Sequence, residues 1–234
     1  HAMALLLSSV RKIHHSYVRT REFNFSLNGL VGFDLHGKTV GVVGTGKIGR
    51  VFIDICKGFG MRVLAYDPYP DEKLGVTYCS FEDLCKESDV ISLHCPLTEE
   101  SLHLINRESI AMMKDQVVLI NTSRGALVDS QALLEGVRSK KIGAAALDVY
   151  EEEGELFYED KSTTILDDDT LMLLIAMPNV LVTSHQAFLT REALGNIAKT
   201  TLSSIASYVK GEVMEHEICY QCDPCHKVTG QRCF

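Results

Sequence analysis

The stretch Val40-Gly-Val-Val-Gly-Thr-Gly-Lys-Ile-Gly49 decides the fold of this 234-residue chain. Its apolar start, residues 39–43, is typical of a buried parallel strand, and a helical pattern follows the glycines. Gly44, Gly46 and Gly49 form a G-x-G-x-x-G sequence at the turn between the two. Such glycines permit a tight turn, close approach of a pyrophosphate and close helix–strand packing. The helix N-terminus then offers unpaired N–H groups to phosphates.

The residues after this motif favour a dinucleotide-binding site over a glycine turn without a ligand. A second strand candidate, residues 61–66, ends at Asp67, eighteen residues after Gly49. An acid at this spacing can bind the ribose hydroxyls of a dinucleotide. Pro68 and Tyr69 follow, and no arginine is at hand to neutralise a 2′-phosphate. The pattern therefore predicts NAD in preference to NADP.

Composition excludes several classes of protein. A formal net charge of −8 argues against nucleic acid or an anionic membrane surface as the main partner. Apolar residues make up 46% of the chain, enough for a sizeable core, but no apolar run is long enough to span a membrane. Scattered cysteines are typical of a reducing compartment, so we expect a cytoplasmic protein. These cysteines are Cys56, Cys79, Cys85 and Cys95.

Short apolar segments alternate with helical ones along most of the chain. The strand candidates are residues 39–44, 61–66, 90–94, 117–121, 143–148 and 180–183. The helix candidates between them are residues 47–58, 81–87, 106–113 and 130–139. This alternation predicts an α/β protein with a doubly wound, mostly parallel sheet, which is the Rossmann type of nucleotide-binding domain.

The chain divides into four segments by pattern. We expect an interdomain helix and connection over residues 1–30, the Rossmann domain over 31–188, a C-terminal helix over 189–212 and a cysteine-rich tail over 213–234. The first segment opens as one helix over residues 2–22, without a cap or a preceding strand, so we expect a fragment whose N-terminal part is missing.

The tail is rich in potential metal ligands. Their spacing fits no common zinc finger, so an irregular tail is favoured and no metal site is predicted. The residues in question are Cys219, Cys222, Cys225, His226 and Cys233.

Three strand ends carry side chains whose chemistry is complementary. Ligands of open α/β sheets bind where strands end, so we expect Arg124, His185 and an acid from residues 148–153 to lie together. An arginine binds a carboxylate through two parallel hydrogen bonds, a histidine donates a proton to a carbonyl as hydride arrives, and an acid stabilises the imidazolium. Alternatively, Arg124 forms an ordinary surface ion pair. Most of the acids within residues 151–169 are expected on a solvated face. A structural role is assigned to His14, His36, His103 and His216.

With these positions the sequence resembles the D-isomer-specific 2-hydroxyacid dehydrogenases over residues 1 to about 212. Within that family it is most similar to the fermentative NAD-dependent D-lactate dehydrogenases, through the acidic insertion at residues 155–161 and the sequence of residues 185–194. The motifs that carry the resemblance are Gly-Thr-Gly-Lys-Ile-Gly (44–49), Tyr-Asp-Pro-Tyr-Pro (66–70), Ser-Asp-Val-Ile-Ser-Leu-His-Cys-Pro-Leu-Thr (88–98), Asn-Thr-Ser-Arg-Gly-Ala-Leu-Val-Asp (121–129) and Leu-Asp-Val-Tyr-Glu-Glu-Glu (147–153).

The resemblance implies roles for individual residues. Arg124 matches the substrate-binding arginine, Glu153 the acid paired with histidine, and His185 the acid/base. Phe188 matches the aromatic residue near the substrate side chain. Asp67 is implied at the adenosine ribose and Asp148 at the nicotinamide amide. The full set implied at the cofactor is Gly44, Gly46, Lys47, Ile48, Gly49, Asp67, Pro96, Thr122, Ser123 and Asp148.

The resemblance also implies an activity. It implies hydride transfer between NADH and a small 2-oxo acid, with pyruvate and D-lactate as the expected pair, in a homodimer or higher homo-oligomer. Another substrate, such as glyoxylate or hydroxypyruvate, and a non-catalytic NAD-binding module like the related corepressors are the alternatives. The family's substrate domain, which helps to bind the substrate carboxylate, is largely missing from the chain. The resemblance therefore predicts a fragment that binds cofactor but turns over slowly.

Overall fold

The computed structural model describes residues 1–212, apart from the side chain of Glu155. The chain divides into two compact units, His1–Ala187 and Phe188–Phe234. Residues 1–30 are thus in the same unit as the glycine motif. The cysteine-rich tail, and with it the prediction about metal binding, lies outside the described residues. In the described part of the chain, no helix is long and apolar enough to cross a membrane.

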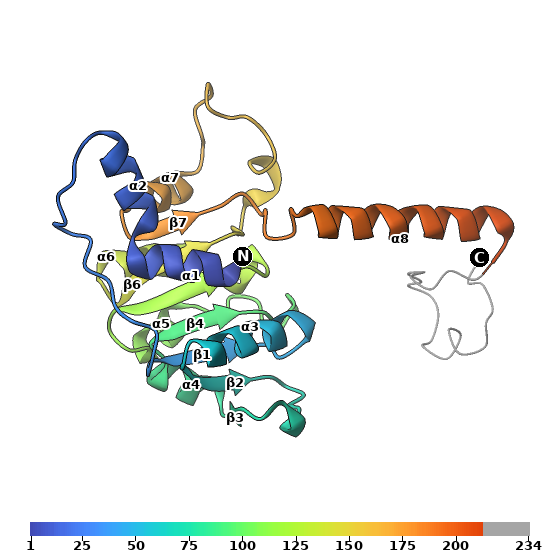
Figure 1. The fold of residues 1–234 in the computed structure, drawn as a ribbon, viewed down its shortest axis with the longest axis horizontal. Helices are drawn as coiled ribbons and strands as arrows, with labels where there is room; N and C mark the ends of the chain where they lie inside the picture. Colours follow the sequence, from blue (N-terminus) through green and yellow to red (C-terminus); the bar gives the residue numbers. More distant parts are fainter. Residues whose placement is uncertain (213–234) are drawn as a thin grey trace. The chain divides into compact units, whose positions relative to one another are not determined.

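A seven-stranded parallel sheet forms the centre of the first unit (Figure 1). Its strands are β1 (Thr39–Val43), β2 (Arg62–Tyr66), β3 (Thr77–Tyr78), β4 (Val90–Leu93), β5 (Val117–Asn121), β6 (Ile142–Leu147) and β7 (Val180–Val182). They lie in the order β3-β2-β1-β4-β5-β6-β7, and Val43 of β1 is in register with both Tyr66 of β2 and Leu93 of β4. The strand order reverses between β1 and β4, which is where doubly wound sheets bind their ligands.

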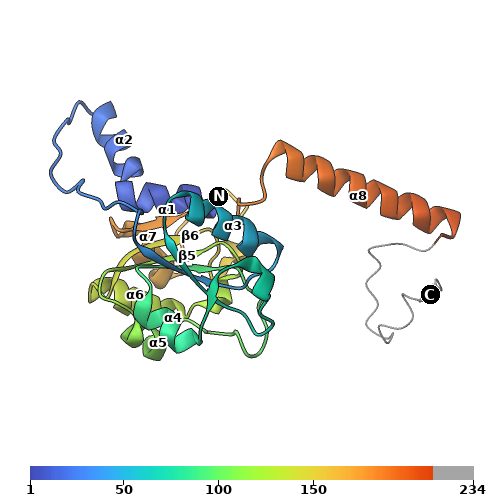
Figure 2. The same ribbon diagram turned by 60° about the horizontal axis from the view of Figure 1, so that its bottom comes forward.

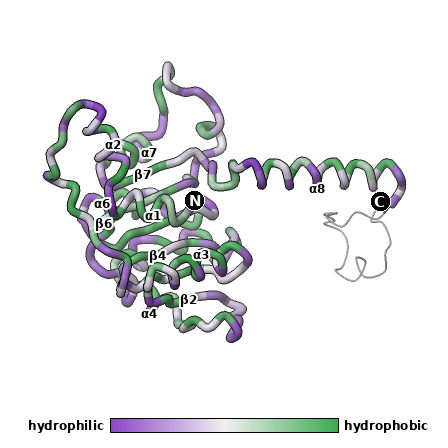
Figure 3. Tube along the Cα trace, in the orientation of Figure 1, coloured by the Kyte–Doolittle hydropathy of each residue, from purple (hydrophilic) through white to green (hydrophobic). Residues whose placement is uncertain are grey.

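Helices cover both faces of this sheet (Figure 2). One face is covered by α1 (Ala2–Arg11) and α3 (Lys47–Gly58), and the other by α4 (Phe81–Glu87), α5 (Arg107–Met112), α6 (Ser130–Arg138) and α7 (Asp169–Ala176). Each face has its own apolar cluster, in which Leu6 and Ile53 are buried on the first side and Leu84 and Leu133 on the second. Figure 3 shows the hydrophobic strands that lie between the two clusters. The predicted Rossmann class of fold is confirmed.

The predicted strands and the four predicted helices between them are confirmed to within one residue at each end. Within residues 1–212, four short elements were not predicted. The strand β3 has two residues, too few for an apolar pattern to be visible. The three 3-10 turns η1 (Glu72–Leu74), η2 (Gly125–Leu127) and η3 (Glu153–Glu155) were also not predicted.

The prediction of one continuous opening helix is wrong. The first helix ends at Arg11, Lys12 takes a left-handed conformation with φ of 52°, and a second helix, α2 (Ile13–Arg21), follows. Leu5, Leu6 and Val10 of α1 are buried, but Ile13 and Tyr17 of α2 are 53% and 60% exposed. The helical spacing of apolar residues in the sequence therefore continues into α2, although α2, unlike α1, buries no residue.

The described part of the second unit consists mainly of one helix, α8 (Arg191–Lys210). The side-chain oxygen of Thr190 accepts a hydrogen bond from the N–H of Ala193 and so caps its first turn. At its other end Gly211, with φ of 79°, provides the left-handed residue that often ends a helix. The prediction of a helix in this segment is confirmed.

Candidate active site

The glycine motif forms the turn between β1 and α3, and its glycines have different surroundings. Gly44 has φ of 94°, and a Cβ there would lie 2.7 Å from the carbonyl carbon of His94 after β4. A Cβ on Gly49 would lie 2.0 Å from the carbonyl oxygen of Gly44. By contrast, a Cβ on Gly46 would meet nothing within 4 Å. Gly46 is the N-cap of α3 and provides no capping side chain, so the space beside this helix N-terminus is open to a phosphate.

Asp67, at the end of β2, holds the glycine loop. Its Oδ2 accepts hydrogen bonds from the N–H and Oγ1 of Thr45 at 2.7 and 2.9 Å, and its Oδ1 accepts one from the N–H of Tyr69 at 2.9 Å. Burial alone would raise the pKa of Asp67, but these hydrogen bonds and the nearby charge of Arg50 lower it overall. Asp67 is therefore ionised at neutral pH. Sequence reasoning missed Thr45, whose role becomes visible only when β1 and β2 are paired.

Arg50 corrects the expectation that no arginine lies near Asp67. Its Nε donates to the carbonyl oxygen of Thr45 at 2.9 Å, and one of its terminal nitrogens pairs with Oδ2 of Asp71 at 2.8 Å. The charge of Arg50 is thus shared with a second acid. Because Arg50 is paired with Asp71 and Asp67 is ionised, NAD remains the predicted choice.

We expect the protein to bind NADH at least about 10-fold more tightly than NADPH, because ionised Asp67 accepts hydrogen bonds from ribose hydroxyls and repels a 2′-phosphate. Fluorescence titration with each reduced cofactor measures both dissociation constants. Asp67→Asn removes the charge at constant shape and should narrow the difference between the dissociation constants for NADH and NADPH. The exposed neighbour Glu72 gives a matched control, because Glu72→Gln should leave the difference between the two dissociation constants unchanged. Equal or tighter binding of NADPH by the wild type would contradict the assignment.

The other residues predicted at the cofactor lie on the loops around the motif. Lys47 and Ile48, in the first turn of α3, are exposed, and Thr122 is partly buried after β5. Ser123 donates its hydroxyl to the carbonyl oxygen of Cys95 at 2.5 Å, which joins the loops after β4 and β5. The carbonyl oxygen of Pro96 accepts the hydroxyl of Ser101 at 2.8 Å. Binding of cofactor by these residues remains a prediction.

His94, at the end of β4, was not weighed as a proton donor from the sequence. Burial lowers the pKa of its imidazole to about 4. Its Nε2 lies 2.9 Å from Oγ of Ser92, and its ring centroid lies 4.8 Å from that of Phe52. The next residue, Cys95, has its pKa raised by burial to about 11. A neutral histidine and a protonated thiol at neutral pH do not compete with His185 for the acid/base role.

His185, after β7, is hydrogen-bonded to the predicted acid. Its Nδ1 lies 2.7 Å from Oε1 of Glu153, and the two side chains are 28% and 22% exposed. The other oxygen of Glu153 accepts the N–H of Tyr150 at 2.8 Å, which orients the carboxylate. An ionised carboxylate only accepts, so Nδ1 donates. Nε2, which makes no hydrogen bond to the described residues, is left for exchange of a proton with a ligand.

Asp148 holds the segment that carries His185. Its side chain is fully buried, and its oxygens accept the hydroxyl of Thr183 and the N–H groups of Gln186 and Ala187, the latter two at 3.0 and 2.8 Å. Its backbone carbonyl accepts the N–H of His185 at 2.6 Å. Asp148 therefore fixes the conformation of this loop. Its predicted contact with a nicotinamide amide remains a prediction.

Arg124 follows β5 and is exposed to solvent. Its guanidinium donates to the carbonyl oxygen of Ser123 at 2.7 Å and makes no ion pair within residues 1–212, so an ordinary surface ion pair is not observed. Asn121 fixes the turn by donating its side-chain N–H to the carbonyl oxygen of Arg124 at 2.8 Å. Phe188 belongs to the second unit, and its role at the substrate stays a prediction.

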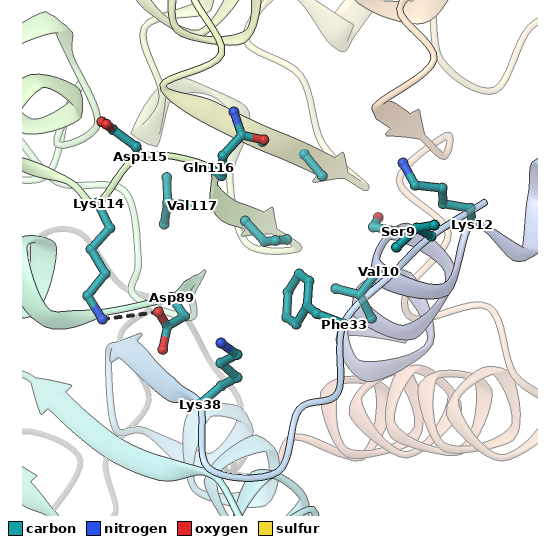
Figure 4. A pocket seen from close by; sticks show the side chains of 15 residues that line it. Ser9, Val10, Lys12, Phe33, Lys38, Asp89, Lys114, Asp115, Gln116 and Val117 are labelled. Atoms are coloured by element: carbon teal, nitrogen blue, oxygen red, sulfur yellow. Dashed lines mark hydrogen bonds and ion pairs between the residues drawn. The ribbon is translucent and has the colours of Figure 1, made fainter. Parts of the chain in front are cut away.

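A cavity of about 350 Å³ lies at the amino ends of the strands, whereas the glycine motif lies at their carboxyl ends (Figure 4). Lys38, Asp89 and Gln116, which line it, precede β1, β4 and β5, whereas the glycine motif follows β1. Lys114 pairs with Asp89 at 3.0 Å across its wall. None of the predicted site residues lines this cavity. In the part of the chain that the structure describes, no group of three or more His, Cys, Asp or Glu side chains could hold a metal ion.

Comparison with known proteins bears on the cofactor and the reaction. Residues 3–187 match the family model described as D-isomer specific 2-hydroxyacid dehydrogenase, NAD binding domain. The D-lactate dehydrogenase of Escherichia coli strain K12 is 52% identical over 221 residues, which cover 93% of this chain and 67% of that relative. Because the matching model is that of an NAD binding domain, the prediction that the cofactor is NAD is confirmed.

Two solved structures give the same comparison in three dimensions. The structure of the pyruvate reductase of Chlamydomonas reinhardtii has a TM-score of 0.89 at 46% identity, covering 92% of this chain and 67% of that one. The D-lactate dehydrogenase of Aquifex aeolicus, complexed with NAD and lactic acid, has a TM-score of 0.83 at 38% identity. The match covers 90% of this chain and 65% of that one. The chain therefore spans about two thirds of the length of the relatives that it matches.

Proposed function

The chain belongs to the D-isomer specific 2-hydroxyacid dehydrogenase family, and we propose that the protein reduces pyruvate to D-lactate with NADH and catalyses the reverse reaction. The observation that carries this proposal is the hydrogen bond between Nδ1 of His185 and Oε1 of Glu153, beyond the carboxyl ends of a parallel sheet. The names of the relatives support the choice of substrate, since the Escherichia coli protein is a D-lactate dehydrogenase and the Chlamydomonas reinhardtii protein a pyruvate reductase.

The residues around the glycine motif fit NAD. Gly46 leaves open space at the N-terminus of α3 for the pyrophosphate, and ionised Asp67 can accept hydrogen bonds from ribose hydroxyls. When bound, the cofactor supplies the hydride that is added to the carbonyl carbon of the 2-oxo acid. The remaining steps belong to side chains of this chain.

Arg124 and His185 have complementary tasks in this reaction. The guanidinium of Arg124 binds the substrate carboxylate through two parallel hydrogen bonds and polarises the adjacent carbonyl. Nε2 of His185 gives its proton to the carbonyl oxygen as the carbon accepts hydride, so that a 2-hydroxy acid is formed. Glu153, bonded to Nδ1, stabilises the imidazolium before the transfer and orients the ring.

The test is a steady-state assay of the whole protein, including the substrate domain that the resemblance implies, in which NADH absorbance is followed with pyruvate, glyoxylate and hydroxypyruvate. We expect the highest kcat/KM for pyruvate, and stereospecific analysis of the product should find D-lactate. A higher kcat/KM for another 2-oxo acid would overturn the choice of substrate. Binding of NADH without reduction of any of them would favour the non-catalytic module. The hydrogen-bonded His185–Glu153 pair argues against that alternative, because a binding module needs no proton donor.

We further propose a homodimer or higher homo-oligomer in the cytoplasm. Apolar side chains on α2 and in the connection after it are exposed, including Tyr17, Phe23 and Phe25, and such patches are typical of protein interfaces. Light scattering on the purified protein measures its mass, and a monomer at all concentrations would contradict self-association. Fractionation of cells tests the compartment, which the cysteine usage supports.

A further inference from the structure

A second histidine–glutamate pair precedes the proposed acid in sequence. Nε2 of His103 is hydrogen-bonded to Oε1 of Glu151, two residues before Glu153. The other oxygen of Glu151 accepts the hydroxyl of Ser130 at 2.9 Å and its N–H at 3.3 Å. A structural role was predicted for His103, and Glu151 belongs to the acidic run of which most members were expected on a solvated face. We call His103, Glu151 and Ser130 the clasp.

His103 attaches the connection between β4 and α5 to the segment after Arg124. Its backbone is left-handed, with φ of 49°, and its N–H donates to the carbonyl oxygen of Ala126 at 2.9 Å. The N–H of Ile105 donates to the carbonyl oxygen of Leu127, also at 2.9 Å. These bonds bring the imidazole of His103 to the turn η2, which begins immediately after Arg124.

Glu151 receives donors from two elements at once. Ser130 is the first residue of α6, so its N–H is among those that the helix itself leaves unpaired and that an anionic group stabilises. His103 donates to the same carboxylate from the opposite connection. The Glu151 side chain is 22% exposed, and bonds to an ionised group of this kind are stronger than neutral ones.

The backbone beside Glu151 contacts both parts of the proposed catalytic machinery. A Cβ on Gly125 would lie 2.0 Å from the carbonyl oxygen of Tyr150 and 2.5 Å from the nitrogen of Glu151, so the two segments touch backbone to backbone. The N–H of the same Tyr150 donates to Oε2 of Glu153 at 2.8 Å. One short segment therefore connects the neighbour of Arg124 to the acid that orients His185.

We propose that the clasp is a positioning device that fixes Arg124 relative to the Glu153–His185 pair. The inference rests on the proposed function, in which Arg124 binds the carboxylate of a small molecule while His185 reaches its carbonyl oxygen. The carboxylate and the carbonyl oxygen that these residues bind are carried by adjacent carbon atoms, so a displacement of one loop weakens the reaction even when each side chain is intact. His103, Glu151 and Ser130 act through other residues and do not touch substrate.

The variants His103→Leu and His103→Gln test this role as a matched pair. Leucine removes the donor, whereas the side-chain amide of glutamine places an N–H donor at about the reach of Nε2. We expect His103→Leu to lower kcat/KM for pyruvate about 10-fold, mainly by raising KM, with an unchanged Kd for NADH. The pH profile should not move, because the Glu153–His185 pair is retained. His103→Gln should recover most of the activity, and His36→Leu controls for loss of a histidine elsewhere.

Hydrogen exchange of the backbone amides of residues 122–130 gives a readout that is independent of turnover. Exchange should be faster in His103→Leu than in the wild type and should return towards the wild-type rate in His103→Gln. The proposed role of the clasp would be overturned if exchange were unchanged in His103→Leu. It would also be overturned if exchange were faster but kcat/KM stayed that of the active wild type. A wild type that reduces no 2-oxo acid would instead contradict the proposed function, so the two failures are distinguishable.

Discussion

Replacing His185 by alanine is expected to lower the rate of pyruvate reduction by about 10²–10⁴-fold, because the substrate carbonyl loses its proton donor. The affinity for NADH should stay close to that of the wild type, since the glycine motif and Asp67 lie on other loops. Steady-state kinetics measure the rate and fluorescence titration measures the affinity. A loss of less than 10-fold would contradict the role of His185.

A second variant separates the chemistry from local strain. His185 has a left-handed backbone, with φ of 52°, which alanine adopts less readily than asparagine. His185→Asn should therefore preserve the loop that Asp148 holds and still lose activity to the same extent. If His185→Asn retained wild-type activity, the loss in His185→Ala would be a consequence of strain and not of a missing proton donor.

Replacing Arg124 by lysine is expected to lower kcat/KM for pyruvate about 100-fold with little change in NADH affinity. Lysine keeps the positive charge but cannot form two parallel hydrogen bonds to a carboxylate, and charge-assisted bonds contribute about 1.5–3 kcal/mol. Kinetics at varied pyruvate concentrations measure the effect. The matched control is Arg107→Lys, because Arg107 makes two hydrogen bonds to Glu135 on the exposed surface, where such a pair contributes little. Wild-type kinetics in Arg124→Lys would show that Arg124 does not bind substrate.

The sequence predicted the sheet well because its signals are local. Buried parallel strands are short apolar runs, and the glycine motif marks where the first strand ends and the helix begins. The break at Lys12 was not predictable in this way, because the apolar pattern continues through Ile13 and Tyr17, which the sheet does not cover. Periodicity indicates an amphipathic helix but not what lies against its apolar face.

The candidate site was predictable in its parts but not in its connections. The positions of Arg124 and His185 after strands follow from the sheet, while the choice of Glu153 among neighbouring acids came from the resemblance to a known family. The clasp joins residues 48 positions apart in the chain, His103 and Glu151, and no local pattern shows such a contact. The hydrogen bonds that Asp148 accepts from the loop of His185 depend in the same way on tertiary structure.

The pH dependence of pyruvate reduction in the wild type and in Glu153→Gln tests the central claim most directly. Reduction needs protonated His185, so the rate falls as rising pH removes the imidazolium proton. Glutamine keeps the shape of Glu153 but not its charge, so Nδ1 of His185 loses the charged acceptor that favours the imidazolium. We therefore predict that the falling limb of the Glu153→Gln profile lies at lower pH, while that of Glu152→Gln, at an exposed neighbour, coincides with the wild type. Superimposable profiles for wild type and Glu153→Gln would contradict the assignment of Glu153 as the partner of His185.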